Sequence, residues 1–513
     1  MQNKPRVPTP RQATYKLSVR NAEKILKKYK GFLSKKDLGK ILSSSLANPD
    51  KDLDTVTEEF LEKKYSIDKI ETLLESANKS YYTHKDIMKK LGISRSRFYF
   101  RLNYIKRFLI KRKFQWILKK GGLTRIPHDS ADKRRITGLL KNKPLERKIL
   151  LNPGPVLTSY GVKNALVQND ICHRDEDFEI LMKRLKRNSL RIFDADDNHS
   201  VVFISGSGTA GMEAAISSTI PSDKKILVLA NGAFGERLYE IAKLHKLKTV
   251  LIRKNWGELF DLNEVEDALK ADKDIFAIAM NHHETSVGIL NPINKVGKLA
   301  RKYEKMFIVD GISSVGGEPL SVRNDNIDIC ITSANKCLHG FSGVNLICVN
   351  NRVWKMIENV EPRSYYLDLK KYQKYSENLN QTPYTPAVAV FFALEQAIRE
   401  LLEKGMKRRW LRYIELNSII KYELSRMGFE FFTNYDCQSH AILTVKIPEY
   451  VDFKQFYHDV KEAGFIIYPC KPPLADRYFQ IANMGELRRG MVYDFVFTVE
   501  RILEKMKKPR RRK

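Results

Sequence analysis

The 513-residue sequence has no long apolar run, few cysteines and no apolar leader at its basic N-terminus. A membrane-spanning helix needs about 20 mostly apolar residues, so we expect no transmembrane segment. A secretory signal needs an apolar stretch that is missing here. The six cysteines form no C-x-x-C pair, which indicates neither a zinc site nor a disulfide framework. We therefore expect a cytoplasmic protein without a bound metal or a membrane partner.

What the sequence has in excess is positive charge, formally +31. Residues 1–150 hold 38 Lys and Arg against 15 Asp and Glu, whereas residues 151–513 hold 53 against 45. The surplus therefore lies in the N-terminal part and in a short basic tail at 506–513. This asymmetry favours an anionic partner such as nucleic acid, with a merely solvated basic surface as the alternative.

The N-terminal part shows helical periodicity and almost no strand-like runs. It predicts an all-α domain at 14–120, after a disordered basic leader at 1–13. Within it, YYTHKDIMKKLGISRSRFYFRLNYI predicts a helix–turn–helix with its turn at Gly92. Basic and aromatic side chains of the second helix would then contact nucleic acid: Arg95, Arg97, Tyr99 and Arg101. A purely structural helix pair, or one that serves dimerisation, remains the alternative.

The pattern of apolar residues changes after a Gly-, Pro- and charge-rich linker predicted at 121–148. Short β-branched runs then alternate with helical segments. The predicted strands are VVFI, KILVLA, TVLIRK, IFAIAM, MFIVD, ICITS and NLICVN. This alternation predicts an α/β fold at 149–390, a mostly parallel sheet covered by helices on both faces. A single long helix and a small α+β domain are expected within 391–505.

Three features at the ends of predicted strands are suited to binding a ligand or to catalysis. The turn Gly206-Ser207-Gly208-Thr209 leads from a strand into a helix, which suits a phosphate. Asp310 ends MFIVD, and Lys336 follows ICITS, 26 residues further on. A lysine buried there would lose solvation, so its pKa would fall and its amine could form a Schiff base. Since parallel strands end at one edge, these features predict one site.

Seven segments, in order, resemble class V aminotransferases, which are pyridoxal-phosphate (PLP) enzymes of fold type I. They are LLNPGP, SGSGTAGMEAA, ANGAFGER, HHETSVGILNPI, FIVDGISSVGG, SANKC and TPYTPAV. Within that family, GFIIYPCK and IANMGEL add a similarity to 2-aminoethylphosphonate–pyruvate transaminases. The resemblance covers about residues 149–490 and implies a large PLP-binding domain, a small C-terminal domain and a homodimer.

The resemblance also implies residue roles. Lys336 would hold PLP as a Schiff base and carry the Cα proton, and Asp310 would keep the ring nitrogen protonated. Phe234 would stack on the ring, and Thr285 would contact its O3′ side. The other cofactor-binding residues would hold the phosphate: Ser207, Gly208, Thr209 and Asn335 within the subunit, and Thr382 and Thr385 for the neighbouring subunit.

One position departs from the family pattern. Gln480, in YFQIANMGEL, stands where the family has an arginine that binds the substrate carboxylate bidentately. Losing such a charged contact costs roughly 1.5–3 kcal/mol. Arg477 or Arg363 would compensate, or the substrate lacks a carboxylate at that point.

These observations predict a PLP-dependent aminotransferase that converts 2-aminoethylphosphonate, or a related small amine, with pyruvate or another 2-oxo acid. Two alternatives stay open. One is another class V activity, of the alanine–glyoxylate type or a PLP lyase. The other is a DNA-binding regulator that uses a PLP fold as its sensor domain.

Overall fold

The structure, a computed structural model, describes residues 148–433 and 435–507, the short segments 116–119 and 122–125, and Ile41. The chain divides into two compact units, Met1–Leu145 and Glu146–Lys513. The predicted leader, the helix–turn–helix with Arg95, Arg97, Tyr99 and Arg101, most of the linker and the tail end all lie outside the described residues.

The first unit contains one described element pair, the antiparallel strands β1 (Trp116–Lys119) and β2 (Gly122–Arg125). Trp116 lies opposite Arg125, and Lys119 lies opposite Gly122. The strand β1 corrects the expectation that 116–119 belong to a helix, and β2 lies within the predicted linker at 121–148. The bulky Trp and Ile of WILK favour a strand, and their β propensity outweighs a short helical pattern.

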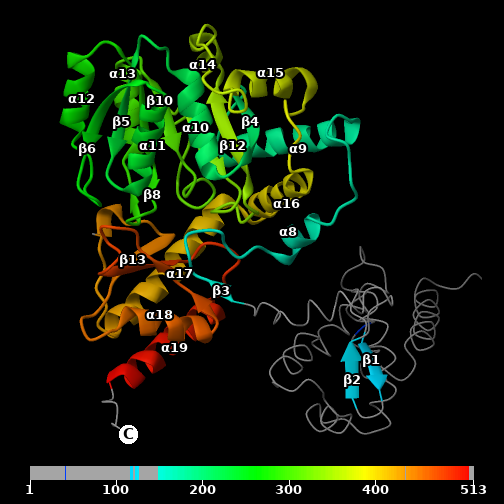
Figure 1. The fold of residues 1–513 in the computed structure, drawn as a ribbon, viewed down its shortest axis with the longest axis vertical. Helices are drawn as coiled ribbons and strands as arrows, with labels where there is room; N and C mark the ends of the chain where they lie inside the picture. Colours follow the sequence, from blue (N-terminus) through cyan, green and yellow to red (C-terminus); the bar gives the residue numbers. More distant parts are fainter. Residues whose placement is uncertain (1–40, 42–115, 120–121, 126–147, 434, 508–513) are drawn as a thin grey trace, which may run out of the picture. The chain divides into compact units, whose positions relative to one another are not determined.

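The second unit is built on a seven-stranded sheet in the order β4-β12-β11-β10-β7-β5-β6 (Figure 1). All neighbours are parallel except β12, which is antiparallel to both β11 and β4. The seven predicted strands are confirmed: β4 (His199–Gly206), β5 (Lys225–Ala230), β6 (Lys248–Arg253), β7 (Ile275–Asn281), β10 (Met306–Asp310), β11 (Ile329–Ser333) and β12 (Gly343–Asn350).

Helices cover both faces of this sheet because successive strand residues point to opposite sides. Val201 and Phe203 of β4 pack into one cluster, whereas Val202 and Ile204 pack into another. The first cluster is covered by α9 (Glu176–Ile192), α12 (Leu262–Ala271), α13 (Ile293–Lys302) and α16 (Val388–Lys404). The second is covered by α10 (Gly208–Thr219), α11 (Ala233–Leu244), α14 (Asn351–Met356) and α15 (Leu369–Leu379). A short α8 (Tyr160–Ala165) packs on α16, and β8 (His283–Glu284) pairs with β9 (Ile289–Leu290).

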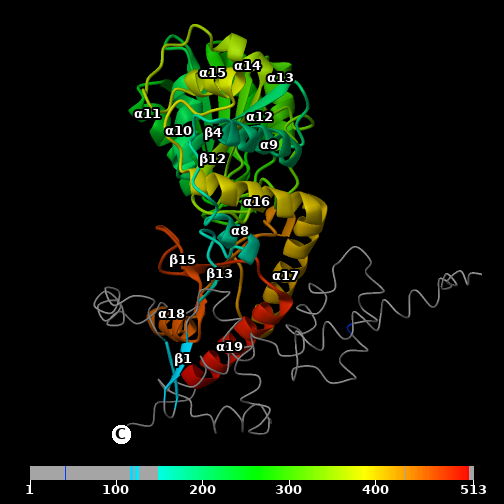
Figure 2. The ribbon, with the colours of Figure 1, turned by 90° about the vertical axis from the view of Figure 1, so that its right-hand side faces the viewer.

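The helix expected as one long element after residue 386 is two helices. α16 ends at Lys404 and α17 (Met406–Arg426) starts after Gly405, and Figure 2 shows the two meeting at an angle. Gly405 has φ 87°, a left-handed conformation that glycine adopts without the strain that a side chain brings. The helical sequence pattern continues through this position, so only the glycine marked the break.

A smaller C-terminal domain follows. Its three-stranded sheet has the order β13-β16-β15, namely Ile442–Lys446, Tyr478–Ala482 and Tyr468–Pro469. The helices α18 (Phe453–Glu462) and α19 (Arg489–Lys507) pack with α17 around one core, and a 3-10 turn spans Tyr435–Cys437. The strand β3 (Ile149–Leu150) pairs with β14 (Phe465–Ile466), so the first residues of the predicted large domain join the small one. In the described part of the chain, no helix is long and apolar enough to cross a bilayer.

Candidate active site

The predicted phosphate turn joins β4 to α10 at the edge of the sheet. Gly206 has φ 149°, and a Cβ on Gly208 would come within 2.8 Å of Ile312 Cδ1, so both positions favour glycine. Ser207 is the N-cap of α10, yet its side chain makes no capping hydrogen bond, and the first turn has no acidic residue. The open N-terminus of α10 therefore has the features of an anion site.

Asn345 of β12 shapes this turn from the neighbouring strand. Its amide donates to the carbonyls of Gly206 at 3.1 Å and Ser207 at 2.7 Å. These bonds turn the two carbonyls toward the sheet, so the N–H groups of the turn are left for a ligand.

Helix α11 brings an aromatic ring and a cation to the same place. The Arg237 guanidinium donates to Thr209 Oγ1 at 3.2 Å, and its Cζ lies 4.6 Å from the centroid of the Phe234 ring. Phe234 and Arg237 are three residues apart, hence on one face of the helix. A cation thus lies between the phosphate turn and the predicted stacking residue.

The N-terminus of α11 is held by a buried carboxylate, Glu284. Its oxygens accept the backbone N–H of Phe234 at 3.2 Å and that of Gly235 at 3.0 Å, and the Asn281 amide at 2.7 Å. The N–H and hydroxyl of Ser286 donate to it as well. A fully buried carboxylate is tolerated when donors and a helix dipole surround it. Glu284 therefore positions the helix that carries Phe234 and Arg237.

Asp310 ends β10 and is 5% exposed. Burial raises the pKa of Asp310 to about 6, the Ile312 N–H at 2.9 Å opposes this, and the Glu284 carboxylate adds to it. A buried carboxylate with one bonded oxygen is suited to pair with a protonated ring nitrogen.

Lys336 follows β11 and is partly buried. Its amine donates to the Pro153 carbonyl at 2.5 Å, and a Cβ on Gly154 would come within 2.7 Å of Nζ. Burial, with smaller contributions from Arg237 and Lys471, lowers the pKa of Lys336 to about 8, against the opposing effects of Cys337 and Asp310. About half of the amine is therefore available as a free base at pH 8, as a nucleophilic lysine requires.

The remaining cofactor candidates lie around these groups. Thr285 is buried, and its hydroxyl donates to Ser313 Oγ at 2.7 Å. The Asn335 amide oxygen accepts the Ser333 hydroxyl at 2.8 Å, which orients it beside Lys336.

Gln480 occupies a buried place in β16, at the junction of the two domains. Its amide donates to the Thr285 carbonyl at 2.7 Å and to Thr444 Oγ1 at 3.1 Å. Both N–H groups are thus engaged within the chain, so in this arrangement Gln480 ties the Thr285 loop to the small domain. Its predicted contact with substrate would require these bonds to break.

The two arginines expected to compensate differ in position. Arg477 is exposed just before β16. Arg363 donates to the Ser217 carbonyl at 3.0 Å, near the C-terminal end of α10. That end lies about 14 Å along the helix from the phosphate turn, at 1.5 Å per residue. Arg363 is therefore remote from the turn, and Arg477 keeps its place as a candidate.

The segment with the two threonines is held from outside by Arg174. The guanidinium donates to the carbonyls of Thr382 at 2.6 Å and Pro383 at 2.9 Å. Thr382 is buried, and its hydroxyl donates to the Tyr384 carbonyl at 2.7 Å, whereas Thr385 is exposed. Among the described residues, the Thr385 hydroxyl contacts only His173 Nε2, at 3.5 Å, so of the two hydroxyls it is the more accessible to a neighbouring subunit.

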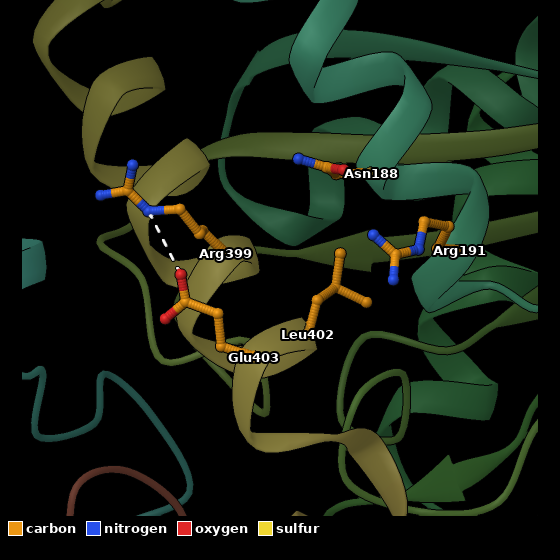
Figure 3. Close-up of a pocket in the computed structure, with 5 residues that line it drawn as sticks. All are labelled: Asn188, Arg191, Arg399, Leu402 and Glu403. Carbon is orange, nitrogen blue, oxygen red and sulfur yellow. Dashed lines mark ion pairs between the residues drawn. The ribbon is translucent and has the colours of Figure 1, made fainter. Parts of the chain in front are cut away.

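A hollow between α9 and α16 lies apart from these residues (Figure 3). It is lined by Asn188, Arg191, Arg399, Leu402 and Glu403, with an Arg399–Glu403 ion pair of 3.9 Å. It holds none of the predicted cofactor residues and no nucleophile, whereas the strand-end site brings Lys336 and Asp310 together.

Known proteins share the sequence pattern and the fold of this chain. The family model for aminotransferase class V matches residues 156–468. A 2-aminoethylphosphonate–pyruvate transaminase of Lysinibacillus sphaericus is 33% identical over 341 residues, which cover 66% of this chain and 92% of that protein. An uncharacterised aminotransferase of Methanocaldococcus jannaschii is also 33% identical, over 66% of this chain and 88% of its own length.

Among solved structures, an alanine–glyoxylate aminotransferase of Nostoc sp. matches with TM-score 0.67 and 25% identity, over 74% of this chain and 100% of that one. A ureidoglycine–glyoxylate aminotransferase of Bacillus subtilis matches with TM-score 0.67 and 26% identity, over 72% and 96%. The chain belongs to the class V aminotransferase family. It is a PLP-dependent aminotransferase.

The residues present fit PLP. An uncapped helix N-terminus beside Arg237 suits the phosphate, the buried Asp310 suits the ring nitrogen, and the Lys336 amine suits the aldehyde. Arg237, Glu284 and Lys471 were not predicted as site residues, although they lie in the family-like segments ANGAFGER, HHETSVGILNPI and GFIIYPCK. Asn345 was not predicted either, and none of these segments contains it.

Proposed function

We propose that this aminotransferase transfers the amino group of 2-aminoethylphosphonate, or a related small amine, to pyruvate or another 2-oxo acid. The observation that carries the proposal is the set of Lys336, Asp310 and the phosphate turn at one sheet edge, in a chain 33% identical to enzymes named for that reaction. When bound, PLP supplies an electron sink for the substrate carbanion.

The chain's own residues would do the rest. Lys336 would move a proton to and from the substrate Cα, for which a pKa near the working pH is favourable. Asp310 would hold the proton on the ring nitrogen, and Glu284 would keep α11 and its Phe234 ring in place. The α10 N-terminus and Arg237 would bind the phosphate and orient the cofactor.

We further infer a homodimer in which Thr385 contacts the neighbouring subunit's cofactor phosphate. Support comes from the exposed Thr385 and from a nearby group of partly exposed tyrosines, in which Tyr365 is 80% exposed and its ring centroid lies 5.6 Å from that of Tyr384. Rings of this kind are enriched at interfaces. Sedimentation velocity should give a dimer, and Thr385→Ala should weaken PLP binding; a monomer with full activity would contradict the inference.

The test of the main proposal is an absorbance spectrum of the purified protein during addition of amines. We expect a visible band from the lysine-bound cofactor, absent in Lys336→Ala. 2-Aminoethylphosphonate should bleach the band, and pyruvate should restore it. A band that 2-aminoethylphosphonate leaves unchanged would refute the proposed substrate.

A second candidate is transamination between alanine and glyoxylate, favoured by the 25% identity to the Nostoc enzyme of that name. In that case alanine would bleach the band and glyoxylate would restore it. The nucleic-acid contact predicted for Arg95, Arg97, Tyr99 and Arg101 remains a prediction, because the family match starts at residue 156.

A further inference from the structure

Lys471 lies in a firmly anchored turn of the small domain. The flanking Cys470 and Leu474 are buried with Val287 and Ile289, which follow the Thr285 loop of the large domain. The Leu474 N–H also donates to the Lys471 carbonyl at 2.8 Å. The backbone of Lys471 is therefore held in place relative to the candidate active site.

The side chain of Lys471 brings a cation to that site. Its ammonium lies 5.3 Å from the centroid of the Phe234 ring. Together with Arg237, it is one of the two cations that lower the pKa of the Lys336 amine. Lys471 itself is exposed, and within the described part of the chain its ammonium has no carboxylate partner.

The two cations beside Phe234 differ in what they already bind. Arg237 donates to Thr209 Oγ1, so it belongs to the phosphate turn. The Lys471 ammonium has no such bond to the turn and comes from the opposite domain. Gln480, at the position of the expected arginine, carries no charge and uses both amide N–H groups within the chain. The site thus lacks the expected anion-binding group but has an uncommitted cation.

We propose that Lys471 binds the anionic end of the amine substrate, in the role that Gln480 cannot fill. The amino end would lie toward Lys336 and the acid group toward Lys471. This inference rests on the proposed function, since it assumes a small amine with an acid group. An ammonium is a point charge without the planar fork of arginine, so it discriminates by charge rather than by shape. A doubly charged phosphonate should therefore bind better than a carboxylate.

The experiment measures binding apart from turnover. Ethylphosphonate and propionate, which have the acid group but no amine, are titrated calorimetrically into the PLP-loaded enzyme. The loaded enzyme is used so that the anion cannot take the place of the cofactor phosphate. Lys471→Gln should weaken ethylphosphonate binding about five- to tenfold, as for a partly exposed charged contact. Lys471→Arg should retain most of the affinity.

Lys454 provides the matched control, because it is an exposed lysine of the same domain on α18. Lys454→Gln should leave both dissociation constants unchanged. Raising the salt concentration should weaken ethylphosphonate binding to the unaltered enzyme, and less so to Lys471→Gln.

Three results would overturn the proposal. Unchanged ethylphosphonate affinity in Lys471→Gln is one, and a loss confined to Arg477→Gln is another. The third is binding to the unaltered enzyme that does not respond to salt, which needs no variant. Failure of the proposed function is separate: if propylamine and 2-aminoethylphosphonate both leave the cofactor band unchanged, the enzyme uses another amine, whatever Lys471 does.

Discussion

The lowered pKa of Lys336 yields a quantitative prediction about the protein without its cofactor. An ordinary lysine has a pKa of 10.5, so only about 0.3% of its amine is neutral at pH 8. With a pKa of about 8, half of the Lys336 amine is neutral at that pH. Lys336 should therefore have a roughly 150-fold larger nucleophilic fraction at pH 8.

The assay is competitive labelling with fluorodinitrobenzene. The cofactor-free protein is labelled across a range of pH in the presence of Nα-acetyl-lysinamide, and the modified Lys336 peptide is quantified by mass spectrometry. The labelling rate of Lys336 should rise with a midpoint near pH 8, about 2.5 pH units below that of an ordinary lysine amine. In Lys471→Gln the midpoint should move upward, because a positive neighbour that disfavours the charged amine is gone.

A Lys336 midpoint at pH 10 or above would refute the reasoning, because it would mean that the amine stays hydrated. An unchanged midpoint in Lys471→Gln would contradict the placement of its ammonium beside the site. Lys454→Gln removes a lysine from an exposed face of the small domain and should leave the Lys336 midpoint where it was.

Three further predictions concern the surroundings of Lys336. Asp310 favours its protonated form, so its stabilising contribution is present at low pH and is lost as the pH rises through about 6. Asp310→Asn should therefore stabilise the cofactor-free protein at pH 7 by up to about 3 kcal/mol, with no gain below pH 3.8, while abolishing turnover; equal urea midpoints at pH 7 would contradict this. Glu284→Gln should destabilise the protein by about 2–4 kcal/mol and weaken PLP binding, as measured by thermal melts and PLP titrations. Glu240→Gln, on the exposed side of α11, should change neither the stability nor the PLP affinity. Gly154→Ala places a Cβ 2.7 Å from Lys336 Nζ at φ 135°, so PLP should bind at least tenfold more weakly. Gly490→Ala is the control, because a Cβ there would meet open space. Equal PLP affinities of Gly154→Ala and the unaltered protein would contradict the prediction and mean that the backbone at residue 154 shifts to accommodate the Cβ.

The sheet was predictable because its strands are short runs rich in β-branched residues, whose strand preference is visible in the local sequence. KILVLA, MFIVD and ICITS coincide with β5, β10 and β11 residue for residue. The break at Gly405 was not, because the apolar helical pattern continues on both sides of a single glycine. The strand at 116–119 was missed since four residues are too few to show a period.

The residues of the candidate active site also divide into those that the local sequence predicts and those that it does not. Asp310 and Lys336 were predicted because each ends or follows a strand, and parallel strands end at one edge. The internal bonding of Gln480 could not be predicted, since Thr285 and Thr444 are distant in sequence and meet only when the small domain packs on the large one. Lys471 depends on the same packing, through Cys470 and Leu474.

The balance of charge around the site connects these findings. Arg237 and Lys471 lie beside the Phe234 ring, and both lower the pKa of Lys336, whereas the Asp310 carboxylate raises it. Three cations disfavour one another, which is one reason that the Lys336 amine loses its proton readily. A cofactor phosphate beside Arg237 and an acid group beside Lys471 would relieve this repulsion at two separate points. The arrangement therefore favours an enzyme that holds two anions at once, one on the cofactor and one on the substrate. An amine without an acid group would leave Lys471 unpaired.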